Sequence, residues 1–177
     1  MKQVRNGPAI PVGVDHPIGE KIAAARRLLA VHGAALHSDP AVAGLLGRYR
    51  AALRDSRREM EAGGIVAECT ECAVVDGGSC CGRGIENRFD AVLLLVNLLL
   101  GAELPDRPED PDGCWFLGAA GCRIPARHVI CINYVCPRLV RRLGPEGLRS
   151  YQARVAREAD LGFALEEALK RWLRNRT

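Results

Sequence analysis

Eight cysteines confined to one part of the chain constrain its fold more than any other feature. They all lie between positions 69 and 136 of a 177-residue sequence. The stretches around them are rich in glycine and poor in large apolar residues, so burial alone offsets little of the entropy lost on ordering. We therefore expect a shared cross-link, such as a bound metal, to hold this block together. Its members are Cys69, Cys72, Cys80, Cys81, Cys114, Cys122, Cys131 and Cys136.

The rest of the sequence indicates a reducing compartment. The first twenty residues contain no apolar segment of the signal-peptide kind. The longest apolar run, AVLLLVNLLL at 91–100, is about half of the ~20 residues that a membrane span needs. We therefore expect a cytoplasmic protein, where thiols stay reduced and serve as metal ligands or redox groups rather than disulfides.

Helical periodicity flanks the cysteine block on both sides. Apolar residues recur at helical spacing over 17–37 and again from Pro40 to the Gly63–Gly64 pair. After the block, a seam of near-heptad spacing predicts one long helix starting near Pro145. The seam comprises Leu148, Tyr151, Val155, Ala159, Gly162, Leu165, Leu169 and Trp172.

These patterns predict a mainly α fold with a single domain over 1–177. An N-terminal helix pair (17–63) and the long C-terminal helix (145–175) form a bundle, and an irregular cysteine-rich metal-binding block (65–137) lies between them. Within the block, Glu86 to Gly101 predicts a buried helix that is apolar nearly all round.

The spacing of the cysteines is typical of metal ligands. Cys69-x-x-Cys72 is a pair found in zinc and iron–sulfur sites alike, and we expect it in a loop after the glycines. Cys80 and Cys81 are adjacent, so we expect their thiols to diverge, with Gly77–Gly78 letting the backbone fold back. We expect at least one centre to draw on both segments, through the Cys69–Cys72 pair and the Cys131–Cys136 pair. Eight thiols could also serve two centres, with Cys80 and Cys81 in different centres or one of them free.

Residues near the cysteines offer charge compensation. A four-iron cluster or a zinc ion with four thiolates carries a net negative charge, which nearby cations can balance. Glu68, Glu71, Glu86 and Asp90 are interpreted as solvated or helix-capping residues. His128 is interpreted as a donor to a thiolate or, alternatively, as a ligand. The arginines close in sequence are Arg83, Arg88, Arg123, Arg127 and Arg138.

The pattern CTEC…SCC…GCWFLGAAGCRIPARHVIC resembles the YkgJ-type cysteine-cluster proteins, described as zinc- or iron-chelating domains. The resemblance covers roughly Cys69 to Cys136 and neither flank. Pro125 stands where the family has Tyr, and His128 where it has Pro after an Arg. Since the family includes the cysteine-rich part of flagellin lysine N-methylases, for which an iron–sulfur cluster is implied, it favours a 4Fe–4S cluster over zinc. The matching positions are Cys69, Cys72, Cys80, Cys81, Cys114, Phe116, Leu117, Cys122, Ile124, Arg127 and Cys131.

The sequence favours a non-catalytic role, since it contains no dinucleotide, P-loop or nucleophile-elbow motif. Three hypotheses follow: a metalloprotein with a structural, sensory or electron-carrying iron–sulfur cluster, a zinc-stabilised helical adaptor, or a dithiol redox enzyme using Cys69 and Cys72. We expect a protein partner, which the sequence does not identify. The net charge of +4 is too small to indicate nucleic acid, and the oligomeric state stays open.

Overall fold

A computed structural model describes residues 15–75 and 80–176, and the mainly α fold is confirmed. The predicted glycine turn at 77–78 lies outside the described residues. The elements are α1 (Ile18–Ser38), α2 (Pro40–Ala62), α3 (Ile65–Val74), the 3-10 turn η1 (Ile85–Arg88), α4 (Ala91–Leu99), β1 (Leu117–Gly118), β2 (Gly121–Cys122), α5 (Val129–Asn133) and α6 (Pro137–Arg174).

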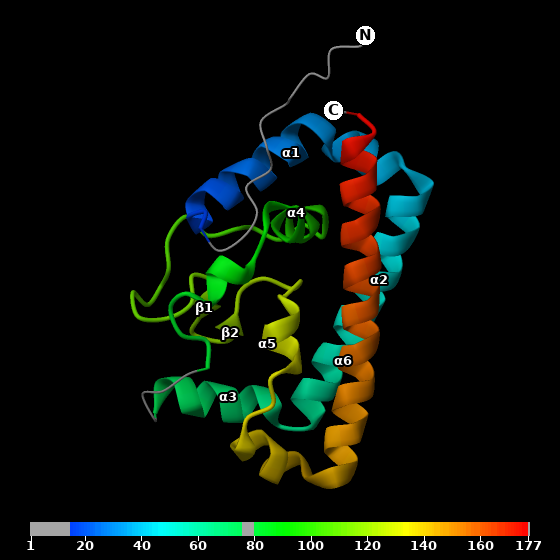
Figure 1. Cartoon of the computed structure of the whole chain (residues 1–177). Coiled ribbons are helices and arrows are strands. Elements are labelled where there is room, and N and C mark those ends of the chain that lie inside the picture. The colour runs from blue at the N-terminus through cyan, green and yellow to red at the C-terminus, as the bar shows by residue number, and fades with distance from the viewer. Residues whose placement is uncertain (1–14, 76–79, 177) are drawn as a thin grey trace.

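The long helices α2 and α6 run antiparallel and form the spine of the molecule (Figure 1). The predicted seam of α6 is confirmed, because Leu165 and Leu169 are fully buried and belong to the main core. Gly162 lies against the ring of Tyr49 on α2, where an added Cβ would be 3.2 Å from the ring. Asp39 accepts from two amides at the start of α2 and from Trp172 Nε1 at 3.1 Å, which joins the two helices.

The helix α1 lies across one end of this spine (Figure 1). It packs more extensively on α4 than on α2. The two N-terminal helices therefore contact each other less than the predicted helix pair would. The buried apolar helix predicted over 86–101 is confirmed as α4 but is shorter. Phe89 is extended (φ −74°, ψ 140°) and Asp90 caps the helix through Leu93 N at 2.7 Å, so the chain changes direction before α4 begins.

Two boundaries differ from expectation. Cys69 and Cys72 lie on α3 and not in a loop, because no helix breaker follows Gly64 until the end of that segment. Helical structure also begins at Pro137, eight residues before the predicted start. Gly144 (φ 63°, ψ 179°) interrupts this helix with a kink. The straight part of α6 begins after the kink, at Pro145, as predicted.

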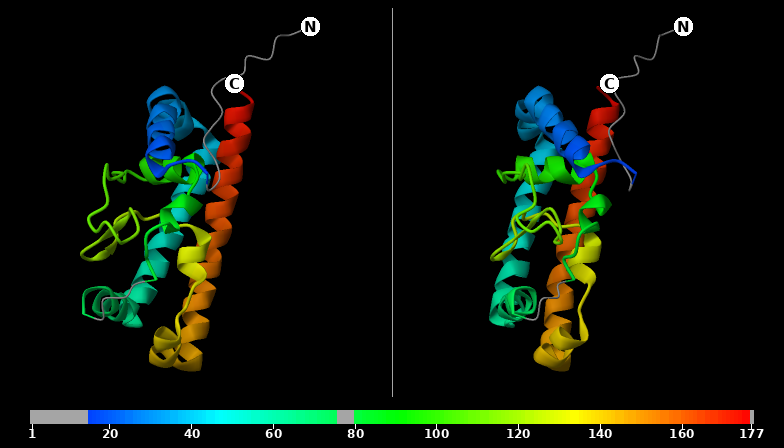
Figure 2. Two further views of the ribbon diagram at one scale, coloured as in Figure 1. Left: turned by 60° about the vertical axis from the view of Figure 1, so that its left-hand side comes forward. Right: turned by 90° about the vertical axis from the view of Figure 1, so that its left-hand side faces the viewer.

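The turn between α2 and α3 sets the direction of the cysteine-bearing helix. Gly64 has a φ of 73°, a conformation that favours glycine, and an added Cβ would lie 2.9 Å from the Arg142 guanidinium. Figure 1 shows α3, the hairpin β1–β2 and α5 on one side of the α2–α6 spine, and the right-hand view of Figure 2 turns that side toward the viewer. Among the described residues, no helix is both long and apolar enough to cross a membrane.

Candidate metal centre

All eight cysteines line one cavity of about 950 Å³. The cavity lies between α2, α3, the β1–β2 hairpin, the segment around α5 and the start of α6. None of the eight thiols forms a disulfide. The tertiary structure therefore brings together residues that are up to 67 positions apart in the sequence. A single zinc ion with four ligands occupies a small part of such a volume.

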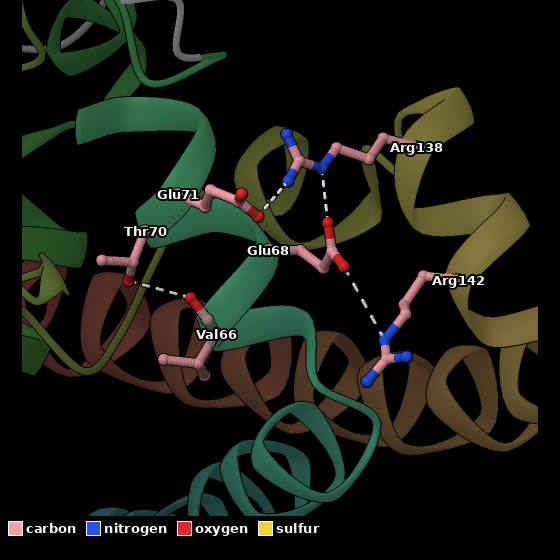
Figure 3. A network of polar contacts seen from close by, with 6 residues as sticks. All are labelled: Val66, Glu68, Thr70, Glu71, Arg138 and Arg142. Atoms are coloured by element: carbon pink, nitrogen blue, oxygen red, sulfur yellow. Dashed lines mark hydrogen bonds and ion pairs between the residues drawn. The ribbon is translucent and has the colours of Figure 1, made fainter. Parts of the chain in front are cut away.

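Ion pairs attach α3 to the start of α6 (Figure 3). Arg138 contacts the carboxylates of Glu68 and Glu71, and Arg142 Nε lies 3.8 Å from Glu68 Oε1. Glu68 and Glu71 directly precede Cys69 and Cys72, so the ion pairs fix the position of that cysteine pair beside Cys136. Glu68 is only partly exposed and binds two arginines, so its interpretation as a solvated or capping residue is wrong, whereas Glu71 is exposed as expected and also contacts Arg138.

Backbone pairing holds the other part of the cavity. The Cys114 amide donates to the Cys81 carbonyl at 2.7 Å, next to an antiparallel bridge between Gly82 and Gly113. Leu117 on β1 pairs with Cys122 on β2. The resulting loop packs against the main core through the buried ring of Phe116, which contacts Phe89 at 4.9 Å between ring centroids.

A buried asparagine ties α4 to the same loop. Asn97 Nδ2 donates to the Ala126 carbonyl at 2.9 Å, and the Ala126 amide donates to Asn97 Oδ1 at 2.8 Å. Both residues are fully buried. Since Ala126 lies between Cys122 and Cys131, this reciprocal contact positions both cysteines relative to the core.

Burial changes the acidity of the thiols. It raises the pKa of Cys114 to about 12 and that of Cys131 to about 11. The amides of Phe116 and Ile124 donate to the sulfurs of Cys114 and Cys122 and lower their pKa values in part. Amide donors of this kind favour the charged thiolate, the form that binds metal.

The adjacent thiols of Cys80 and Cys81 contact each other. Their hydrogen bond is the largest of the causes that raise the pKa of Cys80, followed by burial. The prediction that these two side chains diverge is therefore wrong for this structure. Metal binding at either sulfur would have to replace this contact.

Cations line the cavity from more than one element. Of the arginines expected from sequence proximity, Arg127 and Arg138 line it, whereas Arg123 binds Glu109 at 3.0 Å. Sequence reasoning missed Arg50, Arg54 and Arg57, which line the cavity from α2. Their i, i+4, i+7 spacing is the signal that they share one helix face. Arg50 and Arg54 have no ion pair with any residue that the structure describes.

Glu158 is a further residue that sequence reasoning missed. It lines the cavity from α6, is 1% exposed, and neither carboxylate oxygen has a hydrogen-bond partner within the described residues. Arg127 lies 3.9 Å away. Burial raises the pKa of Glu158, and the neighbouring Ser56 side chain, followed by Arg127, lowers it in part. The signal in the sequence is a carboxylate between Val155 and Gly162, where the heptad spacing of α6 would place an apolar residue.

His128 has a structural role. Its Nδ1 accepts from the Ile130 amide at 3.2 Å and caps α5, and its ring lies 6.0 Å from Phe89. The side chain does not line the cavity. Its amide N–H, however, donates to the sulfur of Cys131 and lowers that pKa. The expected support for a thiolate thus comes from the backbone of His128 and not from its imidazole.

The cavity is not arranged around one ion. Across residues 15–75 and 80–176, no three cysteine, histidine, aspartate or glutamate side chains are grouped closely enough to hold a single metal ion. Eight thiols around one space, with amide donors and arginines beside them, are nevertheless the donor chemistry of thiolate-ligated metal. Models of known protein families, curated proteins and solved structures were compared with this chain, and none matches it.

Proposed function

We propose that this protein is a small metalloprotein that binds an iron–sulfur cluster through cysteine thiolates. The observation that supports it most is the convergence of all eight free thiols on one cavity. Donor chemistry fits, because thiolates are the usual ligands of such clusters and amide hydrogen bonds to sulfur tune them. The resemblance to the YkgJ-type family points to the same chemistry, and a cytoplasmic location would keep the thiols reduced.

The cluster would supply one-electron exchange or a structural cross-link, and the chain itself supplies its environment. Arg50, Arg54 and Arg127 offset the negative charge of the thiolates across the cavity. Phe116 and the main core exclude water from one wall. A structural, sensory or electron-carrying role fits this arrangement, with a protein as the expected partner.

A dithiol redox enzyme is less well supported. A nucleophilic cysteine needs a lowered pKa, whereas partial loss of solvent around the sulfur and three neighbouring cysteines raise the pKa of Cys69. If this alternative held, alkylation of metal-loaded protein would be rapid at Cys69 or Cys72. We expect slow alkylation at both, read by mass spectrometry of the digested protein.

The test of the proposal is anaerobic purification followed by quantification of iron, acid-labile sulfide and zinc per chain. We expect iron and sulfide in equal amounts, with a broad absorption near 400 nm that is typical of these clusters in general. Stoichiometric zinc in a colourless protein would instead identify the zinc-stabilised adaptor. A native mass equal to that of the bare chain would rule out both.

A further inference from the structure

The eight thiols fall into two sets according to the contacts that hold their segments. We name Cys81, Cys114, Cys122 and Cys131 the inner set, and Cys69, Cys72, Cys80 and Cys136 the outer set. The inner four belong to the main core or pack against it, whereas Cys136 of the outer set packs on a separate core, and the two sets meet at the adjacent Cys80 and Cys81.

The inner set is held by backbone pairing and by the main core. The Cys81 carbonyl accepts from the Cys114 amide at 2.7 Å, and the hairpin that follows places Cys122 opposite Leu117. Asn97 then fixes Ala126, between Cys122 and Cys131. All four inner cysteines belong to the main core or pack against it, and Cys114 is 6% exposed.

The outer set is held by ion pairs and by a second core. Arg138 binds the glutamates that precede Cys69 and Cys72, and it follows Cys136 by two positions. Cys136 packs against a separate cluster formed by Ile65, Ile132, Leu139, Tyr151 and Val155. The remaining member, Cys80, is exposed, as is Cys69.

The neighbours of each sulfur agree with this division except at Cys81, which lies beside thiols of both sets. Cys122 and Cys81 lie near Cys131, and the same two thiols, together with Glu86, lie near Cys114. Cys69 has Cys81 as its first charged neighbour, followed by Cys136 and Cys72 of its own set. Cys81 appears beside both sets, which is expected of the residue at their junction.

We propose that the chain holds two adjoining metal centres, one bound by the inner set and one by the outer set. Each set contains four thiolates, which complete one four-iron cluster or one tetrahedral zinc. Both centres join the segment before α4 to the segment after it, but Cys136 and not Cys131 completes the set that contains Cys69 and Cys72. This inference rests on the proposed function, since it assumes thiolate-bound metal.

The two centres differ in their exposure to solvent. The outer centre has two exposed ligands, whereas the inner centre is covered by the main core. A chelator in solution therefore reaches the outer centre first. The outer centre is also the one placed to exchange electrons with a partner protein, with the inner centre adjoining it through Cys80 and Cys81.

The test measures iron, sulfide and zinc per chain, together with native mass, in the anaerobically isolated full-length protein and in paired variants. For the parent we expect about eight irons, the content of two four-iron clusters. Cys114→Ser with Cys122→Ser, and separately Cys72→Ser with Cys136→Ser, should each halve the metal content. A parent with one centre, or a pair that loses all metal while its circular dichroism stays helical, would overturn the division.

A charge variant tests the outer set without removing a ligand. Arg138→Gln should release about half of the metal to a chelator faster than the parent does, whereas Arg141→Gln, an exposed neighbour on the same helix, should not. Equal release by both variants would contradict the assignment, even if the cysteine variants failed to fold. Two zinc ions that each pair variant halves would support the division and refute the iron assignment, whereas a metal-free parent would refute both.

Discussion

Buried positions in the seam of α6 show what a single residue contributes to stability. Leu165 is fully buried against the main core, and Leu165→Asp would place an unpaired charge there. We expect a loss of roughly 3–5 kcal/mol in the free energy of unfolding, measured by urea denaturation. Phe163→Asp is the matched control, since Phe163 lies two positions away and is 68% exposed. A parent-like stability for Leu165→Asp would show that the seam is misassigned.

The carboxyl group of Glu166 should make the free energy of unfolding depend on pH. Burial, with the charge of Asp90, raises its pKa to about 7 from an ordinary 4.5. The folded protein therefore binds this proton more tightly than the unfolded chain, and the stability that the proton contributes is full below about pH 4.5 and is lost as the pH rises through 7. We expect Glu166→Gln to be about 2 kcal/mol more stable than the parent at pH 8.

The measurement is the free energy of unfolding from pH 5 to 8. Glu166→Gln should flatten the decline over that range. Lys170 lies 3.7 Å from Glu166 and 3.4 Å from Glu167, and Glu167→Gln, which removes the second of these carboxylates, should keep the decline. A decline of the same slope in both variants would mean that another group is responsible.

At the scale of elements, one side chain on α4, that of Asn97, joins this helix to the loop between Cys122 and Cys131. Asn97→Ala would leave the buried amide and carbonyl of Ala126 without their partner. We expect a loss of about 2–4 kcal/mol, since two buried backbone groups become unsatisfied. The expected effect also includes a lower metal content, because Ala126 lies between two proposed ligands.

The control for this element is Asn133→Ala on α5, which is exposed. Its denaturation midpoint and metal content should match those of the parent. If Asn97→Ala were equally harmless, water or a neighbouring group would be satisfying Ala126, and α4 would not position the loop.

For the whole molecule, removal of metal should loosen the cysteine segments together. Both segments supply ligands to each proposed centre, and metal binding couples to their ordering. Limited proteolysis after chelation should therefore cleave near α3 and within 114–136, while the straight part of α6 resists because it packs along α2. Cleavage in one segment alone would indicate local centres and refute the cross-linking between segments.

Much of this fold could be predicted from the sequence because its signals are local. The Asp39–Pro40 start of α2, the end of α2 at the glycines and the apolar character of α4 follow from capping, backbone freedom and periodicity. The break before α4 and the helix at Cys69 were missed. In both, a short segment takes its conformation from what it packs against, and periodicity over so few residues does not decide it.

The sequence by itself determined that this protein is mainly helical and that its thiols are concentrated in one block. Composition and spacing suffice for that, since cysteine chemistry and helical periodicity need no knowledge of distant contacts. Only the tertiary structure decided which thiols are neighbours, because the Glu68–Arg138 ion pair and the Cys81–Cys114 backbone contact join residues that lie 70 and 33 positions apart. It also placed Arg50 and Glu158 in the cavity wall, since that wall forms only when α2 packs against α6.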